Sequence, residues 1–269
     1  MPANSLHFLL IGDVVGKAGR AAVTKILPEL RQKYRPDAVI MNVENLAHGN
    51  GITPDTITEM EKAGADYFTS GNHIWDNKDG LAYLQQQHAK VIRPANLPLN
   101  NPGKGYLEFS IGTRKILLIN LTGQVFMPQQ ANNPFHCLDE ILKQHSAEQY
   151  SAIIVDLHAE ATSEKQALAA YADGRISLLI GTHTHVPTAD LRTLPKGTGL
   201  VCDVGSVVSA NSIIGAEADK VLYRFLTQMP QSLTPAESSP VLFNSVLCEI
   251  DPATKKTLSL KRIDQQINL

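Results

Sequence analysis

The chain alternates short apolar segments with segments of helical pattern, and this alternation constrains its fold more than any other feature. Apolar runs at residues 6–12, 38–43 and 67–70 predict buried strands. The segments that follow them predict helices over residues 18–33, 54–63 and 77–87. Because strands that alternate with helices are typical of βαβ units, the first half predicts a parallel sheet.

The second half has a more antiparallel character. Two apolar segments flank Gly112-Thr113, which predicts a hairpin. The further predicted strands are 106–111, 115–121, 152–157, 177–181, 189–193, 199–203, 244–250 and 257–263, with helices at 135–144 and 163–171. We therefore expect an α/β fold in which two mixed sheets pack together between outer helices.

Composition limits the class of protein. The chain has 269 residues, is 43% hydrophobic and carries a formal net charge of −2. Since no Gly-, Ser- or Pro-rich linker interrupts the pattern, we predict one domain over residues 1–269. The near-neutral charge provides no broad basic surface, so we expect neither duplex DNA nor an anionic membrane as a partner.

The cysteines and the N-terminus indicate a cytoplasmic protein. Cys137, Cys202 and Cys248 lie far apart and form no C-x-x-C pair, which suits a reducing compartment and offers no thiolate metal site. The N-terminus lacks the basic segment of a signal peptide, and its apolar stretch ends at Asp13, too soon to span a membrane.

Polar residues that can bind a metal ion follow five of the predicted strands. In chain order they are Asp13; Glu44 and Asn45; Asn72 and His73; His158; and His183 and His185. In parallel sheets the carboxyl ends of the strands face one crevice, where ligands bind. His183 and His185 are the strongest element, because residues two apart on a strand point to the same side.

These residue types indicate a dinuclear metal site. Carboxylates, amides and imidazoles without sulfur suit Fe, Mn or Zn. Two carboxylates, two amides and three imidazoles exceed what one ion needs, and they suit two ions roughly 3.5–4 Å apart that share a carboxylate. Taken singly, Asp13 could cap a helix, Glu44 could form a salt bridge and His158 could be a core histidine. One shared site explains them together more economically.

The ordered motifs resemble those of the calcineurin-like metallophosphoesterases, and more closely those of their YmdB-like branch. The matching stretches are IGDVVGKAGR (11–20), NVENLAHGNGIT (42–53), TSGNHIWDNKD (69–79), RPANLP (93–98), DLHAEATSEK (156–165) and GTHTHVPTAD (181–190). They extend over most of the chain. The resemblance implies a four-layer α-β-β-α sandwich, the metallo-dependent phosphatase fold.

The resemblance also implies a division of the ligands between two ions, either di-iron or di-manganese. Glu44 would bridge them. The first ion would be bound by Asp13, Asn45 and His185, and the second by Asn72, His158 and His183.

The implied activity is hydrolysis of 2′,3′-cyclic nucleoside monophosphates or RNA-derived phosphodiesters. A hydroxide that bridges the metals would attack phosphorus, and His73 would act as the general acid. The alternative is a regulator that binds a nucleotide or RNA in the same metal-dependent way without turnover, and such a sensor would not need His73. Homo-oligomerisation stays open.

The chain departs from its relatives in two places. Most calcineurin-like enzymes have D-x-H on the first strand, whereas Val15 stands in place of the histidine here, as in the YmdB-like branch. Residues 206–212 also differ from the family pattern, and we expect this loop near the crevice or at a subunit contact. Glu160 is expected to orient His158 or cap a helix, and Trp75 to stack on a base or pack internally.

Overall fold

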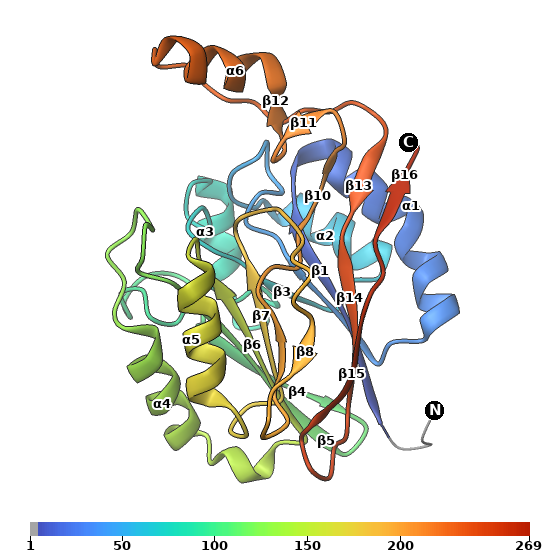
Figure 1. Ribbon diagram of the computed structural model, residues 1–269, viewed down its shortest axis with the longest axis vertical. Helices are drawn as coiled ribbons and strands as arrows, with labels where there is room; N and C mark the ends of the chain where they lie inside the picture. The colour runs from blue at the N-terminus through green and yellow to red at the C-terminus, as the bar shows by residue number, and fades with distance from the viewer. Residues whose placement is uncertain (1–4) are drawn as a thin grey trace.

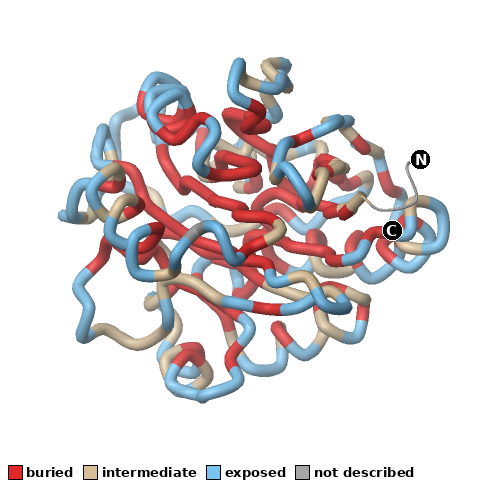
Figure 2. The backbone as a smooth tube through the Cα atoms, turned by 90° about the horizontal axis from the view of Figure 1, so that it is seen from below, coloured by how far each residue is buried: buried red, intermediate tan, exposed pale blue. Residues whose placement is uncertain are grey.

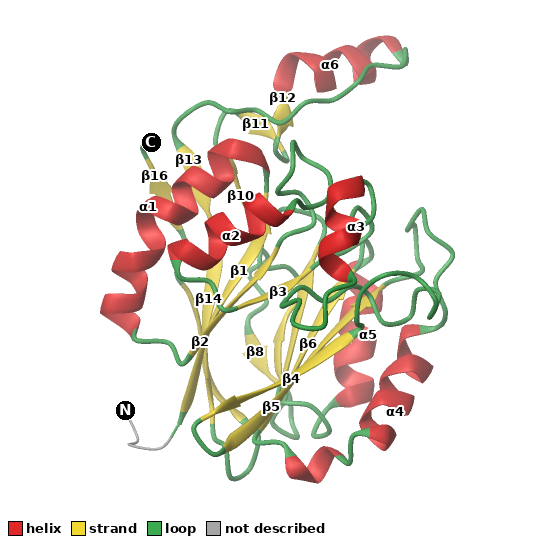
Figure 3. Ribbon diagram, turned by 180° about the vertical axis from the view of Figure 1, so that it is seen from behind, coloured by secondary structure: helices red, strands yellow, loops and turns green. Residues whose placement is uncertain are grey.

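The computed structural model describes residues 5–269. The first four residues, which belong to the segment predicted not to be a signal peptide, lie outside the described part. Within it, two large mixed sheets pack face to face and helices cover their outer faces (Figures 1 and 3). This arrangement confirms the predicted four-layer sandwich.

The first sheet is built around β1 (Leu6–Val14). β2 (Ala38–Asn42) runs parallel to one edge of β1. The other edge pairs with β14 (Ser245–Ile250) as far as Ile11, and β10 (Ser206–Ser209) takes over at Asp13. The remaining strands of this sheet are β3 (Tyr67–Thr69), β13 (Val241–Phe243), β15 (Thr257–Arg262) and β16 (Gln265–Ile267).

The second sheet has a parallel centre with one antiparallel strand at each edge. Its order is β4 (Tyr106–Ile111), β5 (Arg114–Thr122), β6 (Ala152–His158), β7 (Leu178–Thr182), β9 (Gly199–Val201) and β8 (Arg192–Thr193). The predicted hairpin is therefore β4–β5, which leads into the parallel strands.

Alternation along β1 divides its side chains between two cores. Leu9 and Ile11 pack under the helices of the first sheet, whereas Phe8 and Leu10 pack between the two sheets. The first sheet is covered by α1 (Gly16–Tyr34), α2 (Pro54–Ala63) and α3 (Lys78–Leu84), and the second by α4 (Pro134–Gln144) and α5 (Thr162–Ala172). The middle of the molecule is thus buried (Figure 2), and β6 and β7 are buried along their whole length.

Some elements differ from the sequence-based predictions. The predicted strand at 189–193 reduces to β8, and the predicted loop at 206–212 begins with the buried strand β10. β13 and β16 were not predicted; nor were a hairpin of β11 (Ser212–Ile213) and β12 (Ala216–Glu217) or the helix α6 (Ala218–Thr227). These strands have two to four residues, too few for a recognisable alternation. β10, β13 and β16 are held by pairing with neighbours distant in sequence, whereas β11 and β12 pair with each other.

A short connection ties the two sheets together beside the carboxyl ends of their central strands. Residues 202–205 leave β9 in the second sheet and enter β10 in the first. A Cβ atom on Gly12 would lie 1.8 Å from the carbonyl oxygen of Gly205, and one on Gly181 would lie 1.9 Å from that of Cys202. Only glycine allows both strands to approach this connection.

Two further expectations concern the chain as a whole. Cys137, Cys202 and Cys248 are all free. Within residues 5–269, no helix combines the length and apolar character needed to cross a bilayer.

We predict that Gly12→Ala and Gly181→Ala each lower the free energy of unfolding by about 2–4 kcal/mol, because the backbone of residues 202–205 would have to move. Gly112→Ala is the control, since nothing lies within 4 Å of its Cβ position and only its φ of +59° opposes the change. That variant should lose about 1 kcal/mol. Chemical denaturation measures all three, and equal losses would contradict the close approach.

Candidate metal centre

The seven predicted ligands, which come from both sheets, meet at the carboxyl ends of the strands. Asp13 lies on β1 opposite Asn42 of β2, and His158 ends β6 opposite Thr182 of β7. The loops after β2, β3 and β7 supply the other ligand residues, namely Glu44, Asn45, Asn72, His183 and His185. Because neighbouring strands pair in register, the loops that carry these ligands begin side by side.

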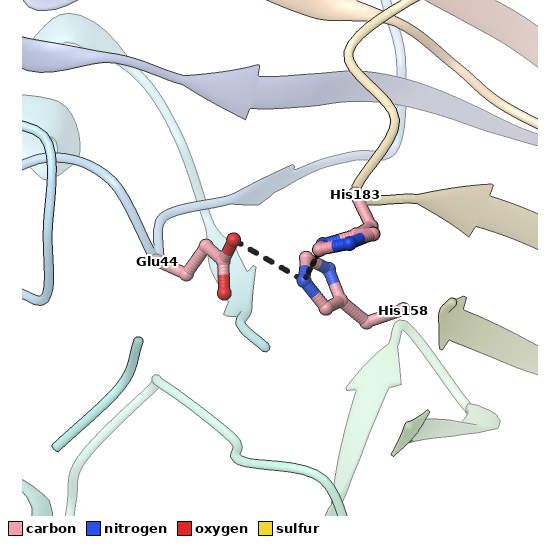
Figure 4. A group of neighbouring side chains, drawn as sticks. All are labelled: Glu44, His158 and His183. Carbon is pink, nitrogen blue, oxygen red and sulfur yellow. Dashed lines mark hydrogen bonds and ion pairs between the residues drawn. The ribbon is translucent and has the colours of Figure 1, made fainter. Parts of the chain in front are cut away.

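One group of ligand atoms surrounds Nε2 of His158. Asn72 Oδ1 lies 3.0 Å from this nitrogen. His183 Nδ1 lies 3.1 Å from it and Glu44 Oε1 3.2 Å (Figure 4). Glu44, His158 and His183 form a group whose ligand atoms all lie within 4.8 Å of one another. These four atoms all carry lone pairs, and at most one proton lies among them. Such a cluster of electron-pair donors is expected where a cation binds.

A second group shares Glu44 with the first. Asp13, Glu44 and His185 also bring their ligand atoms within 4.8 Å of one another. Asp13 Oδ1 and Asn45 Oδ1 are buried and have no hydrogen-bond partner within residues 5–269. Asn45 donates instead through Nδ2 to the carbonyl of Gly49 at 2.8 Å. Because buried oxygens without a hydrogen bond are costly, these two atoms fit the role of cation ligands.

The side chain of His158 is oriented by a buried polar chain. The Thr182 hydroxyl donates to Asp156 Oδ1 at 2.8 Å, so its oxygen is left to accept from His158 Nδ1–H at 2.9 Å. Asn42 Nδ2 also contacts the Thr182 hydroxyl and Asp156, at 3.3 Å each. This leaves Nε2 as the nitrogen that faces the other ligands.

The other two histidines are oriented in the same way. His185 Nδ1 donates to the carbonyl of Ile214 at 2.7 Å, and His183 Nε2 lies 3.2 Å from Glu160 Oε2. Each histidine therefore has one nitrogen paired with a protein acceptor and the other facing the centre, as is usual for metal ligands. Glu160 orients His183 rather than His158, which corrects the prediction.

His183 and His185 do not lie on a strand, so the reason given for their alignment was wrong. β7 ends at Thr182, and the two histidines have φ values of 98° and 64°. Asp203 holds this turn, since its Oδ2 accepts from the Thr184 hydroxyl at 2.7 Å and from the backbone N–H at 3.2 Å. Such backbone conformations cost energy and persist only where surrounding contacts fix them.

Burial and charge shift the ionisation of the centre. Burial raises the pKa of Glu44, but His158 opposes it and the result is about 2. Burial lowers the pKa of His158, but the Glu44 carboxylate raises it to about 9. Burial and the neighbouring His158 lower the pKa of His183 to about 3, and burial raises that of Asp13 to about 6. Without a metal, Glu44 and His158 thus form an ion pair, and a bound cation would replace the proton on His158.

His73 lies beside the ligands without joining either group. Its backbone N–H donates to Glu44 Oε2 at 3.1 Å, and its Nδ1 pairs with Asp76 Oδ2 at 2.7 Å.

The structure decides two further alternatives that the sequence left open. Asp13 is no helix cap, because Val15 holds that position. Trp75 packs against the core and donates to the carbonyl of Pro102.

The sequence analysis missed the residues that support the ligands. Asn42, Asp156, Thr182, Asp203 and Lys165 are all buried. The available signal was a polar residue within an apolar strand, as Asn42 in β2 and Asp156 in β6. Such a residue indicates only that its side chain has a hydrogen-bond partner. It does not identify that partner, because the partners come from other strands.

Gly71 is required by the crowding of the centre. A Cβ atom at this position would lie 2.2 Å from His158 Nε2 and 2.4 Å from Glu44 Oε2. The glycine that precedes Asn72 therefore leaves room for the ligand atoms.

Comparisons with known proteins find similarity over nearly the whole chain. The model of a family described as YmdB-like protein matches residues 9–263, which include the whole centre. A Bacillus subtilis protein named 2′,3′-cyclic-nucleotide 2′-phosphodiesterase is 42% identical over 258 residues, which is 96% of each chain. A crystal structure of a novel phosphatase from Mycoplasma pneumoniae superposes with a TM-score of 0.92 at 36% identity, over 98% of this chain and 95% of that one.

A more distant structure shares the fold alone. The NAD nucleotidase of Haemophilus influenzae superposes with a TM-score of 0.60 at 16% identity, over 98% of this chain and 56% of that one.

We predict that Asp13→Asn changes stability in opposite directions without and with metal. Because burial raises the pKa of Asp13 to about 6, stability from its protonated form is present at low pH and lost as the pH rises through that value. In the presence of a chelator, the free energy of unfolding of the wild type should therefore fall by about 1 kcal/mol relative to that of the variant between pH 5 and pH 8. With excess Mn²⁺ the wild type should be stabilised more. Urea denaturation tests both effects; parallel pH curves and equal responses to Mn²⁺ would contradict them.

Proposed function

The chain belongs to the YmdB-like family, and from this premise we propose that it is a metal-dependent phosphodiesterase acting on 2′,3′-cyclic nucleoside monophosphates. The observation that carries the proposal is the meeting of two ligand groups that share Glu44, with a histidine tied to the same carboxylate. The named activity of the Bacillus subtilis relative supports this substrate class.

We assign the ligands to two cations that share Glu44. Asp13, Asn45 and His185 would hold the first cation, and Asn72, His158 and His183 the second. When bound, the cations would acidify a water molecule and neutralise the charge of the phosphate. Iron is the first choice by family resemblance, and the same ligands accept Mn or Zn.

His73 is proposed as the general acid. Its Nδ1 pairs with the Asp76 carboxylate, so a proton on Nε2 can be given to the ribose oxygen as the P–O bond breaks. The hydrogen bond from its backbone to Glu44 keeps the residue next to the centre. Asp76 orients the ring by holding Nδ1.

The direct test offers 2′,3′-cyclic AMP and bis-p-nitrophenyl phosphate to the protein purified with Mn²⁺ or Fe²⁺. We expect metal-dependent hydrolysis that is lost in Glu44→Ala, with two ions per chain by elemental analysis. Tight nucleotide binding without product would favour a sensor. One ion or none per chain would contradict the shared carboxylate.

We predict that His73→Ala lowers kcat for 2′,3′-cyclic AMP by about 10²–10⁴-fold. The loss should be much smaller with bis-p-nitrophenyl phosphate, because p-nitrophenolate leaves without a proton. His136→Ala, on α4 and remote from the centre, is the control. Metal content of each variant separates the roles: equal losses on both substrates together with lost metal would mean that His73 only supports the ligands.

A further inference from the structure

The β11–β12 hairpin and α6 form an arm that stands out from the sandwich (Figure 1). α6 buries only Val221, and its exposed side chains include Leu222, Tyr223, Phe225 and Leu226. So much apolar surface in one place indicates a binding surface.

Two hollows lie between this arm and the metal centre. The smaller, of about 130 Å³, is bordered by Asn45 and His185. The larger, of about 580 Å³, is bordered by His73, Arg224 and Phe225. They share four wall residues: Asn50, Ile214, Ala216 and Leu233. The space therefore extends from the ligands of the first ion, past His73, to α6.

The arm is joined to the metal centre through Ile214. The carbonyl of Ile214 accepts the hydrogen bond that orients His185, and the same residue borders both hollows. A substrate whose phosphate lies among the metal ligands would place its other half along this wall. The larger hollow lies in the size range of small-molecule sites.

The walls of the larger hollow indicate what kind of group binds there. They are mainly apolar, with Phe225, Ile213 and Leu233 beside the amide of Asn50. Arg224 is the cation of this wall, and no carboxylate within residues 5–269 pairs with it. An aromatic ring next to an unpaired guanidinium suits a planar base attached to a further phosphate.

We propose that the larger hollow is a nucleoside subsite, in which Phe225 stacks on the base of the substrate and Arg224 binds a phosphate on the same nucleoside. This proposal rests on the proposed phosphodiesterase activity. It favours the 3′ end of an RNA chain that carries a cyclic phosphate, because such an end brings both a base and a neighbouring phosphate.

The test compares binding of a nucleotide with binding of phosphate alone. Calorimetry of the Mn²⁺-loaded protein would measure adenosine 3′-monophosphate and inorganic phosphate. Phe225→Ala should weaken the nucleotide roughly 10-fold and leave phosphate unchanged. Leu226→Ala is the matched control, because Leu226 is 83% exposed, Phe225 is 80% exposed and only Phe225 borders the hollow.

Arg224 has its own readout. Arg224→Ala should raise KM for a dinucleotide ending in a 2′,3′-cyclic phosphate several-fold more than KM for 2′,3′-cyclic AMP, with kcat within about 2-fold for both. Equal KM changes for the two substrates would overturn the role of Arg224.

Other outcomes separate this subsite from the proposed activity. If the wild type hydrolyses its substrate but Phe225→Ala binds nucleotide as Leu226→Ala does, the subsite is wrong and the activity stands. If no phosphodiester is hydrolysed but the Phe225 effect on nucleotide binding is seen, the subsite stands and the activity is wrong. If both variants weaken binding equally and also lower the mass by light scattering, α6 is a subunit interface and the proposal fails.

Discussion

The structure depends most on one buried carboxylate, that of Asp203, where the chain passes from the second sheet to the first. Its oxygens accept from Lys165 Nζ at 2.8 Å, from Thr184, and from the Gly205 backbone N–H at 2.8 Å. Because a buried charge needs a partner, removing Lys165 would leave Asp203 uncompensated. Its contacts with Thr184 fix the turn that carries His183. Asp203 therefore holds both the connection between the sheets and the position of a predicted ligand.

The centre gathers more electron-pair donors than protein groups can satisfy. Asp156 and Thr182 pair with each other and with His158, whereas Asp13 Oδ1 is buried and has no hydrogen-bond partner among residues 5–269. Burial raises the pKa of Asp13, which is the sign of a carboxylate that folding has taken out of water. The burial of Asp13 Oδ1 and of Asn45 Oδ1 is therefore a cost that a bound cation would offset.

The arm and the metal centre border a common space in which a substrate could lie. Ile214 connects the orientation of His185 to the hollow under α6, and His73 borders the same hollow. A chain of near-neutral charge has no general attraction for nucleic acid, so local contacts of this kind have to supply its affinity for a substrate.

The sequence by itself determined the two-sheet architecture and the candidate ligands, because strand periodicity and the polar residues that end each strand are local properties. It could not show how the ligands are held. β10 and β13 have three or four residues each, and only pairing with distant strands defines them. His183 and His185 converge through left-handed turns held by Asp203, which only folding brings within reach. The hollow under α6 likewise exists only where the arm meets loops from the first sheet, so tertiary structure alone decided where a substrate could lie.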